Sequence, residues 1–200
     1  RYAAAGADPE RLRAWIRRAF FGEPSLPEDL EALLDAYRAG DPSLRAFAAV
    51  RRQDVRTFAK RLIAAARSGR PGLPVSAALM PEGAYEDTAF SDLHYGQSHE
   101  DAAELYDLAL PMAYSQAYHE NSDWVARVAG GEAARGLHTL VGLHAYEGGT
   151  GRTLAADVRA VAALEDPAGL VEGIALFRAG MTAYAGMDGR KLWIRNALEV

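Results

Sequence analysis

Two glutamates follow apolar runs of the chain, at positions where a carboxyl group can take part in acid–base chemistry. Glu82 follows residues 73–81 (LPVSAALMP), and Glu147 follows residues 138–146 (HTLVGLHAY). Cleavage of a glycosidic bond needs two carboxyl groups, one that protonates the leaving oxygen and one that acts as base or nucleophile. Glu82 and Glu147 are therefore the candidate catalytic residues, although most glutamates in loops are simply solvated.

Aromatic and hydrogen-bonding side chains gather at the ends of these two runs and of two similar ones. Aromatic rings stack on the apolar faces of sugars, and polar groups exchange hydrogen bonds with sugar hydroxyls. We expect Tyr114 and Tyr146 to be stacking platforms, and Gln116, His144 and Arg178 to orient a carbohydrate. For His144, a structural place in the wall of the sheet is equally compatible with the sequence.

Three other kinds of site find less support in the spacing of residues. His94 and His99 have no His-x-x-x-His or carboxylate pattern around them, so no metal site is expected. Ser115 lacks the Gly-x-Ser-x-Gly turn of serine hydrolases. Residues 148–153 (GGTGRT) fail the Walker spacing, although a phosphate-binding loop of a barrel isomerase or aldolase is an open alternative there. The sequence thus predicts a protein without a cofactor.

Composition limits the classes of protein to which the chain can belong. Its 200 residues carry a net charge of −5, which argues against a surface that follows nucleic-acid phosphates. The chain has no cysteine, which excludes disulfides and thiolate metal sites, and it has no 18-residue apolar segment that would span a membrane. No signal peptide is apparent, and the first residue is Arg1, so we expect the chain to have been cut from a longer one.

The first 70 residues are predicted to be helical. Asp8 and Pro9 are typical of a helix start, and a 3.6-residue apolar stripe follows them to Phe20. A second helix is expected over about residues 26–39. A third is expected from residue 42 or 43 to residue 68, where Gly69 ends it.

From residue 73 onward the pattern changes to strands that alternate with helices. Strands are predicted over residues 73–81, 106–115, 138–146 and 170–178, with helices near 98–104, 122–135 and 154–164 and a long loop over 82–97. The strand starts lie 30 to 35 residues apart, close to the roughly 31-residue unit of an eightfold barrel. This predicts an α/β fold with parallel strands, the last four βα units of a (β/α)8 TIM-like barrel. An open doubly wound sheet is the alternative, although the first strand lacks a Gly-x-Gly-x-x-Gly turn.

Several of these segments also resemble a known family. Residues 51–58 (RRQDVRTF), 73–81 (LPVSAALMP), 107–114 (DLALPMAY), 141–146 (VGLHAY) and 173–177 (GIALF) are similar to bacterial glycosyl-hydrolase-like family 10 proteins. The resemblance covers roughly residues 45–185 and implies a TIM barrel that cleaves or binds polysaccharide, often in an envelope or secreted protein. Arg1 and Tyr2 resemble the end of a strand from the first half of that barrel, which implies that a catalytic carboxylate lies upstream.

The sequence therefore predicts one domain over residues 1–200, made of a helical lead-in (1–70), four βα units (71–186) and a tail (187–200). The predicted function is glycoside hydrolysis of a polysaccharide, with a non-catalytic carbohydrate-binding barrel as the alternative. The exposed edge strands of a half barrel also predict pairing with a second copy, as a homodimer.

Overall fold

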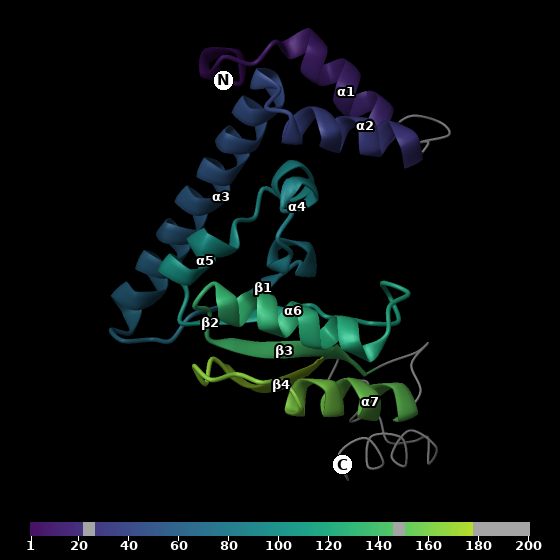
Figure 1. The fold of residues 1–200 in the computed structure, drawn as a ribbon. Helices are drawn as coiled ribbons and strands as arrows, with labels where there is room; N and C mark the ends of the chain where they lie inside the picture. The colour runs from purple at the N-terminus through teal and green to yellow at the C-terminus, as the bar shows by residue number, and fades with distance from the viewer. Residues whose placement is uncertain (22–26, 146–150, 178–200) are drawn as a thin grey trace, which may run out of the picture. The chain divides into compact units, whose positions relative to one another are not determined.

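The structure, a computed structural model, describes residues 1–21, 27–145 and 151–177 (Figure 1). The chain divides into two compact units, one made of Arg1–Pro71 and Asp87–Ser98 and the other of Gly72–Glu86 and His99–Val200. We call them the helical unit and the sheet unit. The first unit ends one residue from the predicted boundary at residue 70, but it also takes in a later segment. A single domain over the whole chain stays a prediction.

The helical unit begins with the 3-10 turn η1 (Ala3–Ala5), which precedes helices α1 (Pro9–Phe21), α2 (Pro27–Arg38) and α3 (Pro42–Gly69). The Asp8 carboxylate accepts hydrogen bonds from the backbone N–H groups of Glu10 and Arg11, which confirms the predicted helix start. The Asp41 carboxylate likewise accepts from two N–H groups in the first turn of α3. The three predicted helices are therefore present within two residues of their expected bounds.

The expected long loop over residues 82–97 is wrong. It contains the 3-10 turn η2 (Pro81–Ala84) and helix α4 (Ala89–His94). Helix α4 forms because Ala89 and Leu93 are buried in the apolar core of the helical unit, and because the Asp87 carboxylate accepts a hydrogen bond from the Ala89 N–H group. No helix in the described part of the chain is long and apolar enough to cross a membrane.

The sheet unit contains strands β1 (Ser76–Leu79), β2 (Leu108–Pro111), β3 (Thr139–His144) and β4 (Val171–Phe177). All neighbouring pairs are parallel, and the spatial order is β1-β2-β3-β4. Asp107 fixes the start of the first pair, because its side chain accepts from the Val75 N–H group and its own N–H group donates to the Val75 carbonyl. Strand order that follows chain order is consistent with part of a TIM-like barrel, whereas a doubly wound sheet reverses its order.

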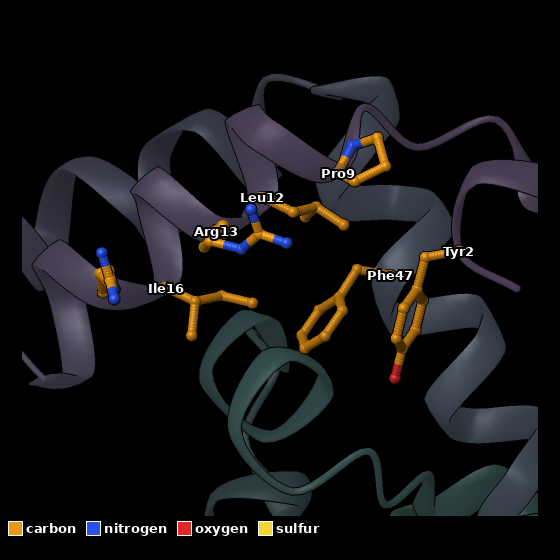
Figure 2. Close-up of a pocket in the computed structure, with 7 residues that line it drawn as sticks. Tyr2, Pro9, Leu12, Arg13, Ile16 and Phe47 are labelled. Atoms are coloured by element: carbon orange, nitrogen blue, oxygen red, sulfur yellow. The ribbon is translucent and has the colours of Figure 1, made fainter.

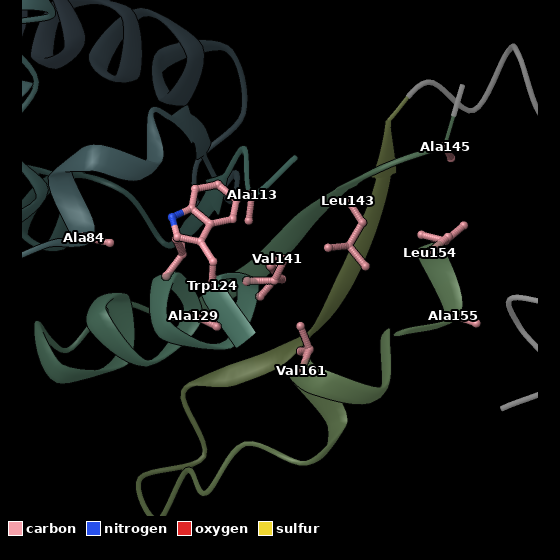
Figure 3. Packing of buried hydrophobic residues seen from close by; sticks show 12 residues of the cluster. Ala84, Ala113, Trp124, Ala129, Val141, Leu143, Ala145, Leu154, Ala155 and Val161 are labelled. Carbon is pink, nitrogen blue, oxygen red and sulfur yellow. The ribbon is translucent and has the colours of Figure 1, made fainter. Parts of the chain in front are cut away.

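One face of the sheet is covered by helices α5 (His99–Leu105), α6 (Ser122–Ala134) and α7 (Gly151–Ala162). Val141 and Leu143 of β3 are fully buried against Trp124 of α6 and Leu154 of α7 (Figure 3). Side chains along a strand alternate between faces, so Leu140 and His144 lie on the opposite face. That second face is only partly buried in the described residues, and we call it the open face. In a TIM barrel the corresponding face lines the interior.

Candidate functional site

The sequence-predicted residues that the structure describes lie along one edge of the sheet. Glu82 lies in η2, three residues after the end of β1, while Tyr114 and Gln116 follow β2 and His144 ends β3. Because the strands are parallel, their carboxyl ends share this edge. Three further predicted residues, Tyr146, Glu147 and Arg178, lie outside the described residues.

An aromatic cluster lies at this edge on the open face. The Tyr114 ring stacks on the Phe177 ring with their centroids 5.5 Å apart, and its centroid is 5.7 Å from that of the His144 imidazole. The parallel register pairs His144 with Phe177. Phe177 is 44% exposed, which is unusual for a large apolar side chain. The sequence placed Phe177 at the end of the fourth strand, facing the predicted site, but it gave this residue no role in sugar binding.

Gln116 lies beside the start of α7. Its side-chain nitrogen donates to the Thr153 hydroxyl at 3.0 Å. Its side-chain oxygen is buried and has no hydrogen-bond partner among the described residues. The amide is therefore held at its nitrogen end by α7, while its oxygen is enclosed.

The turn that carries Tyr114 and Gln116 is anchored by a buried carboxylate that the sequence did not reveal. Asp157 of α7 is 2% exposed and accepts hydrogen bonds from the hydroxyls of Ser115 and Ser122, each at 2.7 Å. Ser115 is itself buried. Its hydroxyl thus links the end of β2 to α7.

Glu82 lies among aromatic side chains that bear hydroxyl or N–H groups. The Tyr118 hydroxyl is 3.4 Å from Glu82 Oε2, and the Tyr118 ring stacks on Trp124 at 5.0 Å. The Trp124 indole N–H donates to the Tyr85 hydroxyl at 2.7 Å. Burial raises the pKa of Tyr85, and the negative charge of Glu82 adds to this effect, whereas the Trp124 hydrogen bond opposes it. Tyr85 thus remains a neutral phenol beside the carboxylate at neutral pH.

Other polar residues from the predicted 82–97 loop belong to the helical unit. Asp87 accepts two hydrogen bonds from the Arg38 guanidinium, which lowers the pKa of that carboxyl. Asp92 accepts from the Tyr37 hydroxyl at 2.8 Å. These carboxylates have structural partners within the helical unit, so we do not assign them to the strand-end site.

Histidines at other positions also have structural contacts. His99 is fully buried in the sheet unit, where its Nδ1 is 2.8 Å from Glu132 Oε2. The His94 ring stacks on Phe90 in the helical unit. Among the described residues, no three histidine, aspartate or glutamate side chains are grouped as a metal ion would require.

The helical unit has a groove of about 350 Å³ of its own (Figure 2). Its lining consists of Tyr2, Pro9, Leu12, Arg13, Ile16, Arg17 and Phe47. The Tyr2 and Phe47 rings lie side by side with centroids 5.3 Å apart. This lining is mostly apolar, and its charged members, Arg13 and Arg17, are hydrogen-bond donors that carry no acceptor atom.

Comparison with known proteins gives one informative likeness. No protein-family model matches the chain, and no curated protein matches it. Among solved structures, the chain is similar to the PgaB (BpsB) glycoside hydrolase domain from Bordetella bronchiseptica, with a TM-score of 0.57 and 16% sequence identity. The match covers 93% of this chain and 51% of that structure, so the chain spans about half its length. At this identity the likeness shows a shared fold of the glycoside hydrolase kind, and it does not show membership of family 10.

Proposed function

We propose that this protein hydrolyses O-glycosidic bonds of a polysaccharide at the carboxyl ends of its strands. The observation that carries the proposal is the aromatic cluster of Tyr114, His144 and Phe177, which lies on the same sheet edge as Glu82. Stacked aromatic rings with hydrogen-bonding neighbours are what a pyranose ring needs for binding. The likeness to a glycoside hydrolase domain supports a sugar as the ligand of such an edge.

In this proposal the two glutamates divide the chemistry. One carboxyl group protonates the leaving oxygen, while the other acts as nucleophile or activates a water. Glu82 and Glu147 take these roles. The Tyr114 and Phe177 rings bind the sugar face, joined by Tyr146, while Gln116, His144 and Arg178 orient hydroxyls.

The test is release of reducing ends from a panel of polysaccharides by the protein and its variants. Glu82→Gln and Glu147→Gln should each lower kcat by roughly 10²- to 10⁴-fold, because each removes a group that transfers a proton. Glu165→Gln is the matched control, since Glu165 is exposed and lies in the loop before β4, at the opposite edge of the sheet. If Glu82→Gln or Glu147→Gln keeps the same kcat as Glu165→Gln, the catalytic role of that glutamate is ruled out.

A non-catalytic carbohydrate-binding protein is the second candidate. It is favoured by the aromatic cluster, because stacked rings can bind the face of a sugar without a catalytic carboxylate. This candidate predicts saturable oligosaccharide binding without release of reducing ends. Phe177→Ala should then weaken binding, while Glu82→Gln should leave it nearly unchanged. Isothermal titration tests the binding surface in both candidates, and release of reducing ends by the wild type separates them.

A further inference from the structure

The turn η2, which carries Glu82, is fitted closely against helices α5 and α6. Pro81, Gly83 and Ala84 are buried, and Glu82 is the member of the turn whose side chain stays partly exposed. The position of the Glu82 carboxylate is therefore set by what holds the buried residues on either side of it.

Gly83 lies directly against the imidazole of His99. A Cβ atom at position 83 would lie 2.1 Å from His99 Nε2 and 2.2 Å from its Cδ2, well inside contact distance. The backbone of Gly83 does not need glycine for its own conformation, because its φ is not positive. The glycine is explained by the close approach of the ring edge.

Glu132 of α6 fixes the plane of that ring. The side chains of His99 and Glu132 are both 0% exposed, and Glu132 Oε2 is 2.8 Å from His99 Nδ1. His99 Nε2 and Glu132 Oε1 have no hydrogen-bond partner among the described residues. A buried pair of this kind contributes little to stability, because apolar residues of similar size can often replace both partners without lowering the free energy of unfolding. What the pair supplies is orientation, because one hydrogen bond fixes which edge of the imidazole faces Gly83.

The other side of η2 is held by the same helix. A Cβ atom at Gly131 would lie 2.2 Å from the Ala84 carbonyl oxygen, so the backbone of α6 is in contact with the turn. The Arg135 guanidinium donates to the Ala84 carbonyl at 2.9 Å and also donates to the Tyr85 carbonyl. With the turn already held at Ala84, a shift of the ring at Gly83 must be taken up at Glu82.

We propose that His99 and Glu132 are positioning residues that place the Glu82 carboxylate at the strand-end site. The part of this inference that concerns catalysis rests on the proposed role of Glu82. Misplacement of a reacting group by about 1 Å can cost 10²-fold in rate, and supporting residues that fix such a group are common in enzymes. His99 and Glu132 touch no substrate in this proposal and act through Gly83.

The mechanical part can be tested without any turnover. The chain contains no cysteine, so Glu82→Cys provides a single attachment point for a nitroxide spin label. Glu132→Leu should broaden the range of label motion at position 82, whereas Glu132→Gln should preserve the order of the label, because its amide oxygen can still accept from His99 Nδ1. Gly83→Ala should shift or mobilise the label too, since the new Cβ cannot share space with the ring.

Two controls separate positioning from general loosening. Val161→Ala truncates a buried side chain of α7 and should leave the label at position 82 as ordered as before. A label attached through Glu165→Cys should respond to none of these changes. An unchanged label at position 82 in folded Glu132→Leu overturns the inference. If Glu132→Leu does not fold, an unchanged label in Gly83→Ala overturns it.

Kinetics then test the catalytic part. Gly83→Ala and Glu132→Leu should lower kcat by 10-fold or more with KM changed less than threefold, and Glu132→Gln should restore most of kcat. If Glu82→Gln keeps full turnover while the label result holds, the proposed role of Glu82 fails and the mechanical inference stands. If Glu82→Gln abolishes turnover but Gly83→Ala changes neither the order of the label at position 82 nor kcat, the positioning inference fails and the proposed function stands.

Discussion

Two adjacent glycines of α6 give opposite predictions for the same substitution. A Cβ atom at Gly131 would lie 2.2 Å from the Ala84 carbonyl oxygen and 3.1 Å from its carbonyl carbon. At Gly130 the nearest atom would be Leu164 Cδ1 at 3.7 Å, an ordinary van der Waals contact. Both glycines lie inside the same helix, so Gly130→Ala is a matched control for Gly131→Ala.

The magnitudes follow from helix propensity and packing. Alanine is better than glycine inside a helix by about 1 kcal/mol, and this gain applies to both positions. At Gly131 the clash is with a carbonyl group of the backbone, which cannot rotate away as a side chain can. Overpacking of this kind costs about 1–3 kcal/mol, and loss of the Arg135 hydrogen bond to the same carbonyl adds roughly 1.5–3 kcal/mol. We therefore expect Gly130→Ala to stabilise the protein by up to about 1 kcal/mol and Gly131→Ala to destabilise it by about 1.5–5 kcal/mol.

The assay is urea unfolding followed by circular dichroism, with thermal melts beside it. For a chain of this size, 1 kcal/mol corresponds to a Tm change of roughly 2–4 °C, so the two variants should melt about 3–24 °C apart. Equal stability of the two variants, or a more stable Gly131→Ala, would refute the close contact between α6 and η2. It would also remove one support of Glu82, because Ala84 belongs to the same turn.

Three further predictions concern other parts of the molecule. Asp157→Ala should lower the free energy of unfolding by about 2–5 kcal/mol in urea melts, because the hydroxyls of Ser115 and Ser122 both lose their acceptor. A loss below 1 kcal/mol would contradict the anchoring role. Burial and the hydrogen bond to Asp92 raise the pKa of Tyr37 from 10.0 to about 12, so the native state holds this proton more tightly than the unfolded chain. The resulting stability, at most roughly 3 kcal/mol, is complete below pH 10 and is lost as pH rises toward 12; unfolding curves over this range should be steeper in pH for the wild type than for Tyr37→Phe, and equal slopes would contradict the assignment. Strands β1 and β4 each pair with one neighbour in the described part of the chain, so sedimentation should show mass that rises with concentration; a monomer at every concentration would speak against the expected dimer.

Local features of the fold were predictable from the sequence because they depend on neighbouring residues. Asp8 and Asp41 accept hydrogen bonds from N–H groups two and three positions away, so a capping residue before an apolar stripe is visible as a pattern. The four strands lie inside the predicted runs because a continuous apolar segment is typical of a strand buried in a parallel sheet. The sequence also predicted that Glu82, Tyr114 and His144 lie at or after the ends of strands, and the structure places them there.

Other features depend on residues that are distant in the chain, so only the tertiary structure decided them. Helix α4 was predicted as loop because six residues carry too little periodicity, and its burial against the helical core is what stabilises it. The pairing of Phe177 with His144 and Tyr114 depends on the register between strands, which a local pattern does not specify. His99 and Glu132 are 33 positions apart in the chain and become partners only because the fold buries them side by side. Sequence alone thus determined which residues reach the strand ends, and three-dimensional packing decided which of them meet.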